Sequence, residues 1–163
     1  MAKQDSFVGV AVLRIAMGWM FLWAFLDKVF GLGFATKAGS GWLAGVSPTK
    51  GFLMNATKGP FVELFQNLAG NPVVDWLFML GLLGIGLALL LGIAVRFASY
   101  CGIVMMVLMF LSLLPPTNNP IIDEHIIYAL VFLVFTQLPV GDTFGMGAYW
   151  RSTDLVKRYP ILG

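Results

Sequence analysis

Four apolar stretches, each close to the length needed to cross a lipid bilayer, constrain the fold of this chain more than any other feature. They lie at about residues 7–28, 73–94, 97–114 and 120–139. A membrane-spanning helix needs about 20 mainly apolar residues. Charged residues make up only 11% of the chain, against about 25% in soluble domains. The sequence therefore predicts an all-α membrane protein in which residues 1–163 form a single domain, a four-transmembrane-helix bundle.

The fourth stretch is the least apolar at its start. Its purely apolar part, Ile126 to Leu138, is too short to cross a bilayer, so we expect the helix to begin near Pro120, a residue type that suits the first helical position. This start places Asp123, Glu124 and the chain's single histidine, His125, at the edge of the hydrocarbon region. One explanation of the two carboxylates is an N-terminal cap, because acidic residues in a first turn complement the helix dipole, but a cap does not explain the histidine.

The connection between the first and second spans, Gly31 to Pro72, is long for a four-helix protein. Its first half is rich in glycine and is expected to be irregular. Its second half contains "GPFVELFQNLAG", in which apolar residues recur at helical spacing between Pro60 and Gly70. This pattern predicts a short helix at the membrane interface. The tail after Gly141 mixes aromatic with basic residues and is expected to be an interfacial anchor.

Four spans place both termini on one side of a cell membrane. The distribution of basic residues favours the cytoplasm for that side, once the long first connection is discounted. The inner segments then hold Lys3, Arg96, Arg151, Lys157 and Arg158. The outer segments hold Lys28, Lys37, Lys50 and Lys58.

Two cations lie on the first span. Arg14 is about 10 Å inside the hydrocarbon region, where it either extends toward the near interface or faces the bundle and binds a ligand. Lys28 follows fourteen residues later and returns to nearly the same helical face. Gly18, Phe21 and Phe25 lie between them, so a flat, partly polar ligand could lie along this face.

In an up-and-down bundle, the end of the first span and the starts of the second and fourth meet on the outer side. This side collects most of the ionisable residues of the spans: Asp27, Lys28, Asp75, Asp123, Glu124 and His125. Histidine titrates near physiological pH by default. The composition is typical of a site that exchanges protons or handles anions.

Several cofactor classes lack their usual ligands. A bis-histidine haem needs two histidines and iron–sulfur clusters need several cysteines, whereas the chain has one of each residue. There is no zinc-ligand spacing, no phosphate-binding glycine loop and no nucleophile motif. We therefore expect no haem, iron–sulfur cluster or metal from this chain alone. The net charge of +2 is scattered and gives no nucleic-acid surface.

Three stretches resemble a known family. "LRIAMGWMFLWAFLDKVFG" resembles the first helix of the DoxX family of small four-helix membrane proteins. "GNPVVDWLFMLGLLGIGLALLLGIAVR" and "LPPTNNPIIDEHIIYALVFL" resemble its DoxD branch more closely. The resemblance implies a four-helix membrane fold and the membrane subunit of a thiosulfate:quinone oxidoreductase. It also implies a DoxA-like or other protein partner.

The hypothesis of a quinone-linked oxidoreductase gives each candidate residue a role. Lys28 and His125 would donate hydrogen bonds to a quinone carbonyl, while Asp123 or Glu124 passes protons as the ring is reduced. Arg14 and Lys28, beside Asp27, are the cations available to thiosulfate. Flat apolar contact with the quinone would come from three aromatic residues: Trp19, Trp23 and Phe25.

Two other functions fit the sequence. A non-catalytic membrane anchor or assembly subunit of a larger complex needs only apolar helices with small-residue strips, such as Gly84, Ala88 and Gly92, and such strips also suit a homo-oligomer. A small-solute permease fits least well, because the spans carry no polar stripe.

Overall fold

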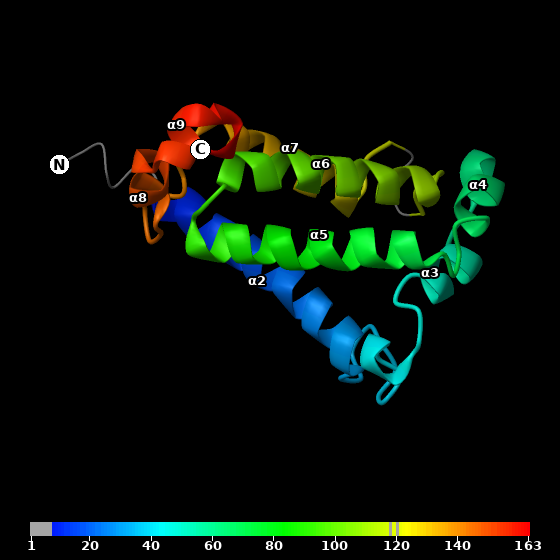
Figure 1. Cartoon of the computed structure of the whole chain (residues 1–163). Helices are drawn as coiled ribbons and strands as arrows, with labels where there is room; N and C mark the ends of the chain where they lie inside the picture. Colours follow the sequence, from blue (N-terminus) through cyan, green and yellow to red (C-terminus); the bar gives the residue numbers. More distant parts are fainter. Residues whose placement is uncertain (1–7, 118, 120) are drawn as a thin grey trace.

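The computed structural model describes residues 8–117, 119 and 121–163, and in these residues it is built from helices (Figure 1). Within this part of the chain, three helices are long and apolar enough to cross a membrane, and a fourth is shorter. They are α2 (Val8–Phe30), α5 (Pro72–Leu91), α6 (Val95–Ser112) and α7 (Glu124–Gln137). The predicted all-α membrane fold is therefore confirmed.

The ends of α5 follow from local sequence. Asn71 caps its start, because the side-chain oxygen accepts a hydrogen bond of 2.9 Å from the N–H of Val73, and Pro72 occupies the first turn. The helix ends at Gly92, whose φ of 72° lies in the left-handed region that glycine adopts without steric cost. The next helix, α6, starts after only three residues, so α5 and α6 form an antiparallel pair.

Helix α7 is shorter than the predicted span of 120–139 and begins only at Glu124. Asp123 is its N-cap, with a side chain that accepts hydrogen bonds from the N–H groups of His125 and Ile126. Leu138 ends the helix in an extended conformation, which the following Pro139 favours. At 1.5 Å per residue α7 is about 21 Å long. Asp123, as the N-cap, lies just before its first residue.

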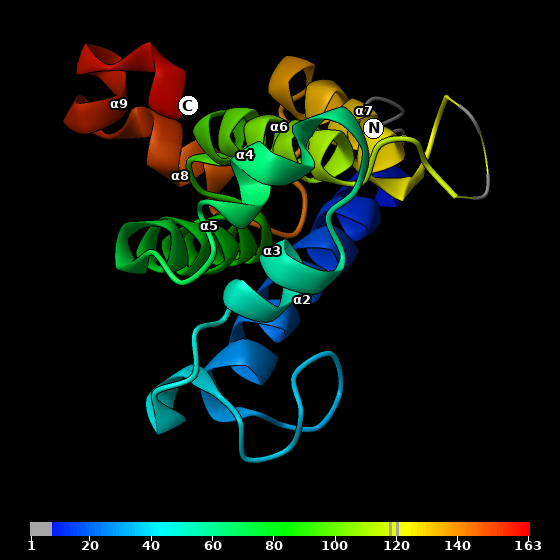
Figure 2. The same ribbon diagram turned by 90° about the vertical axis from the view of Figure 1, so that its right-hand side faces the viewer.

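Helices α2 and α5 approach most closely through two glycines. A Cβ atom on Gly18 would lie 2.8 Å from the backbone nitrogen of Leu90, and one on Gly86 would lie 2.8 Å from that of Leu22. Gly84, the exposed member of the predicted small-residue strip, instead faces open space. Beyond this crossing α2 diverges from α5 (Figures 1 and 2).

The core lies between α2, α5, α6 and α7, all of which contribute buried side chains to one cluster. Phe132 is fully buried, with its ring 5.4 Å from the ring of Phe21 in an edge-to-face contact. Gly102 on α6 makes room for that ring, since a Cβ there would lie 2.5 Å from it. On the opposite face of α5, Leu77 and Leu80 are exposed, as expected for side chains that contact lipid.

The long first loop is partly helical. Its short elements are η1 (Trp42–Ala44), α3 (Lys50–Asn55), η2 (Gly59–Phe61) and α4 (Val62–Gln66). The helix predicted between Pro60 and Gly70 is present as η2 and α4, whereas α3 was not predicted. Figure 1 places α3 and α4 at one end of α5. Trp42 packs edge-on against Trp76 of α5, with the ring centroids 4.6 Å apart, on the side where α2 diverges.

The C-terminal segment lies at the opposite end of the bundle, close to the start of α2 (Figure 1). It forms α8 (Gly147–Ser152), α9 (Asp154–Arg158) and η3 (Pro160–Leu162). We call this end of the molecule the N-end and the end with α3 and α4 the loop end. The indole N–H of Trp150 donates a hydrogen bond of 2.6 Å to the carbonyl of Leu162, which folds the segment back on itself.

Arg14 holds the N-end together. Its side chain is fully buried, and its guanidinium donates hydrogen bonds to the carbonyls of Leu89 and Leu90 at the end of α5. It also donates bonds of 3.0 Å to the carbonyls of Thr143 and Phe144, in the segment after α7. The last carbonyls of a helix have no hydrogen-bond partner within it, and they form the negative end of its dipole. A guanidinium at that position donates hydrogen bonds to these carbonyls and places a positive charge at the negative end.

Glycines make this arrangement possible. A Cβ on Gly92 would lie 2.6 Å from the carbonyl oxygen of Gly141 and 3.2 Å from the Arg14 guanidinium. A Cβ on Gly145 would lie 2.4 Å from the same oxygen of Gly141. The N–H of Met146 donates a bond of 2.9 Å to the carbonyl of Leu91, which completes the end of α5.

We predict that Arg14→Met destabilises the protein by at least about 3 kcal/mol, because each buried carbonyl left without a donor costs about 1–3 kcal/mol. Thermal unfolding in lipid nanodiscs measures the effect. Arg14→Lys should recover only part of the loss, since a single ammonium cannot replace the planar guanidinium. Lys28→Met removes the same charge from the same helix and is the control. An equal loss in Arg14→Met and Lys28→Met would contradict this role.

Candidate functional site

The carboxylates predicted to meet at one site are divided among three places at the loop end. Asp27, at the end of α2, is buried and accepts hydrogen bonds from the backbone N–H groups of Phe34 (3.3 Å) and Thr36 (2.7 Å). It therefore fixes the turn that follows α2.

Asp75, in the first turn of α5, is also buried and serves the first loop. One of its oxygens accepts hydrogen bonds from the hydroxyl groups of Ser47, at 2.9 Å, and Thr49. Thr49 immediately precedes α3. Asp75 thus fastens the middle of the loop to α5. The two hydroxyl groups supply the hydrogen bonds that its buried carboxylate needs.

Asp123, Glu124 and His125 do lie together, where α7 begins. One ligand atom from each lies within 4.8 Å of the others. The Nδ1 atom of His125 is 2.9 Å from Oδ2 of Asp123, while Oδ1 of Asp123 accepts the N–H bonds that cap the helix. His125 is buried and Glu124 is exposed. The capping explanation is correct for Asp123, and the same carboxylate also orients the imidazole.

The Asp123 carboxyl has a pKa below its ordinary value. Burial raises this pKa, but hydrogen bonds from the His125 ring and from the N–H groups of Ile126 and His125 together outweigh the effect of burial. Asp123 is therefore ionised at neutral pH. A carboxylate bonded to Nδ1 favours the proton on that nitrogen.

A pocket of about 250 Å³ lies beside this cluster. Asp123 and Glu124 form part of its wall, with Asn119 and Thr117 from the segment between α6 and α7. The opposite part of the wall comes from the first loop and includes Lys58. We call it the loop-end pocket. Its wall holds an ammonium group, two carboxylates, an amide and a hydroxyl, so it can bind a small molecule that both donates and accepts hydrogen bonds.

The structure does not bring Lys28 to this pocket. The Lys28 ammonium lies 5.9 Å from the centre of the Phe78 ring on α5. Figures 1 and 2 show the end of α2 well separated from the start of α7, where His125 lies. The Lys28–His125 pair expected from the sequence therefore does not form one site.

The three aromatic candidates on α2 are also absent from the wall of the loop-end pocket. Trp19 is exposed and packs against Trp23, with the ring centroids 5.8 Å apart. Trp23 in turn contacts the Phe34 ring edge-on. Phe25 is half-buried against the core. Arg14 lies at the N-end, with its guanidinium bonded to backbone carbonyls, so we assign it to the architecture.

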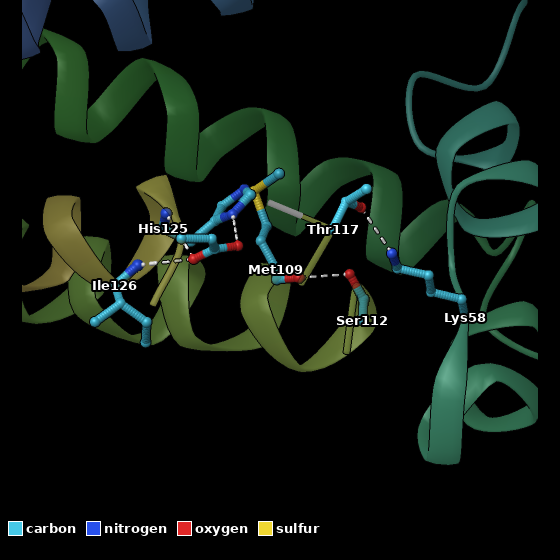
Figure 3. A network of polar contacts seen from close by, with 7 residues as sticks. Lys58, Met109, Ser112, Thr117, His125 and Ile126 are labelled. Carbon is cyan, nitrogen blue, oxygen red and sulfur yellow. Dashed lines mark hydrogen bonds and ion pairs between the residues drawn. The ribbon is translucent and has the colours of Figure 1, made fainter. Parts of the chain in front are cut away.

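Sequence reasoning missed Lys58 as a member of the site. It was counted only as one of four basic residues in outer segments, because a loop residue has no periodic pattern that reveals its neighbours. The one available signal was its place directly before the "GP" that starts the interfacial helix. In the structure, the Lys58 side chain reaches Thr117, with Nζ 2.9 Å from the hydroxyl oxygen (Figure 3).

We predict that Asp75→Ala loosens the first loop, because Ser47 and Thr49 both lose their acceptor. Hydrogen–deuterium exchange should become faster in residues 42–55 and stay unchanged in α6. Glu63→Ala, which removes an exposed carboxylate from the same loop, is the control. Unchanged exchange in residues 42–55 of Asp75→Ala would contradict the attachment.

The comparisons with known proteins identify the family. The DoxX family model matches residues 9–114, more than half of the chain. The match covers α2 to α6 and ends before α7, so it includes Arg14 and Lys28 but not the Asp123–His125 pair. A search of curated proteins and a search of solved structures returned no match. The chain is a membrane protein that belongs to the DoxX family.

Proposed function

We propose that this chain is the membrane subunit of a quinone-linked oxidoreductase, and that the quinone head group binds in the loop-end pocket. The observation that carries the proposal is Asp123, which lines that pocket and is hydrogen-bonded to the buried His125, at one end of an apolar bundle. A lipid-soluble carrier would reach this end through the bilayer, and its reduction needs protons that lipid cannot supply.

The overall reaction takes electrons from thiosulfate. Two thiosulfate ions join through a new S–S bond to form tetrathionate and release two electrons. The quinone accepts these two electrons with two protons and becomes a quinol. A DoxA-like or other protein partner takes part in the thiosulfate half of the reaction, and this chain supplies the quinone site.

Three side chains have roles in proton transfer to the quinone oxygens. Glu124 is exposed and lines the pocket, so it can exchange protons with water. Asp123 lies between the pocket and His125, and the pair can hold a proton while the second electron arrives. Asp123 fixes the ring of His125 through Nδ1.

A second candidate function is a non-catalytic anchor or assembly subunit. The exposed face of α5 favours it: Gly84 faces open space, and exposed Leu80 and Leu87 lie near it on the same helix. Small residues let another membrane helix approach closely. A larger complex that keeps its quinone reductase activity but separates into subunits without this chain would support the anchor function over the catalytic one.

We predict that Asp123→Asn lowers thiosulfate-dependent quinone reduction at least about a hundredfold, the low end of the range for the loss of a general acid or base. Asparagine caps helices about as well as aspartate, so the start of α7 should remain intact. The assay compares quinol formation in membranes that contain the chain and its partner, with equal amounts of wild type and variant.

The control is Glu63→Gln, which neutralises an exposed carboxylate in α4 outside the pocket wall. Glu124→Gln should slow reduction and Glu63→Gln should not. Wild-type turnover in Asp123→Asn and Glu124→Gln would contradict the proposed proton path. An absence of thiosulfate-dependent reduction in the wild type would contradict the proposed reaction.

We also propose that the N-end faces the cytoplasm of the cell. The basic residues there, Arg96, Arg151, Lys157 and Arg158, support this orientation. In a Cys101→Ala background, Ser152→Cys should be protected from a membrane-impermeant maleimide in intact cells, and Lys37→Cys should react. The reverse pattern would contradict the orientation.

A further inference from the structure

We propose that Lys58, from the first loop, is the cationic ligand-binding residue of the loop-end pocket and donates a hydrogen bond to an oxygen acceptor of the bound molecule. This inference rests on the proposed quinone site and names a binding residue for it. The sequence had suggested Lys28 for this position.

The first loop is fixed where Lys58 lies. The backbone N–H of Lys58 donates a hydrogen bond of 3.1 Å to the carbonyl of Ser112, the last residue of α6. The next residue, Gly59, has a φ of 76°, and a Cβ there would lie 1.9 Å from the carbonyl oxygen of Leu114. Backbone contact this close holds the Lys58 main chain against the segment that leads to α7.

The Lys58 ammonium has more N–H donors than it uses among the described residues. It carries three N–H groups, and among the described residues it makes one side-chain hydrogen bond, to Thr117 (Figure 3). In the same part of the chain, Lys58 forms no ion pair with Asp123 or Glu124, although all three line the pocket. The cation and the carboxylates therefore face a shared space without neutralising each other directly.

This arrangement selects a particular ligand chemistry. The two carboxylates outnumber the one ammonium and disfavour an anion, while the remaining N–H groups of Lys58 call for an oxygen acceptor, so a molecule with uncharged carbonyl oxygens suits this wall. A benzoquinone has two such carbonyl oxygens. The Lys58 ammonium can donate to one of them and stabilise the negative charge that develops there on reduction, while Glu124, which exchanges protons with water, delivers a proton.

The test is direct binding of decylubiquinone, a short-chain benzoquinone, to the purified chain in lipid nanodiscs, followed by isothermal titration calorimetry. We expect Lys58→Met to weaken binding about tenfold, because a hydrogen bond to a charged group contributes about 1.5–3 kcal/mol. Lys58→Arg should bind within about threefold of wild type, since it keeps the charge and the donors. Lys37→Met, in the same loop but outside the pocket wall, should bind as wild type does.

The outcomes separate this inference from the proposed reaction. Weaker binding in Lys58→Met, with Lys58→Arg near wild type, supports the role of Lys58 even if thiosulfate proves not to be the electron donor. Wild-type affinity in Lys58→Met overturns it, and so does a wild-type chain that binds no decylubiquinone. Equal weakening in Lys58→Met and Lys58→Arg would show that Lys58 only holds the loop, and would also overturn it. Thermal unfolding of each variant confirms that the chain remains folded.

Discussion

The rest of the structure depends on how a buried guanidinium satisfies backbone carbonyls at the N-end. Arg14 is bonded to the end of α5 and to the segment after α7, so one side chain joins three parts of the chain that are distant in sequence. A carbonyl in the hydrocarbon region of a membrane cannot form a hydrogen bond with water, so it needs a donor from the protein. With the N-end fixed in this way, and α2 crossing α5 at Gly18 and Gly86, the two helices diverge toward the loop end.

The two ends of the molecule are consequently built by different chemistry. At the N-end, the Arg14 guanidinium and neighbouring glycines hold backbone carbonyls together, beside a pocket of about 150 Å³. At the loop end, carboxylates carry the structure: buried Asp27 fixes the turn after α2, buried Asp75 holds the middle of the loop, and half-buried Asp123 caps α7. Only the last of the three also lines the pocket, and it does so next to the single histidine. This division is why we locate the chemistry at the loop end and the stabilising bonds of Arg14 at the other.

Much of the fold could be predicted because hydrophobic length is a strong signal. The three long spans lie within a few residues of their predicted positions, and Asp123 acts as the predicted type of cap. The site was harder, since helical-face arithmetic says which residues of α2 share a face but not which neighbour that face meets. The up-and-down topology placed Lys28 and His125 at the same end of the bundle, whereas a glycine-dependent contact brings Lys58 to the pocket. The partners of Arg14 are backbone carbonyls, which every residue has, so no residue type in the sequence could reveal them.

The central claim is that the first loop, and not the end of α2, faces the start of α7. Crosslinking with a short bismaleimide tests it most directly, in native membranes and in a Cys101→Ala background. The structure predicts that a Lys58→Cys, Thr117→Cys pair crosslinks within one chain, because these two side chains are in hydrogen-bond contact. A Lys28→Cys, Thr117→Cys pair should not. Efficient crosslinking of the Lys28 pair together with failure of the Lys58 pair would contradict the account.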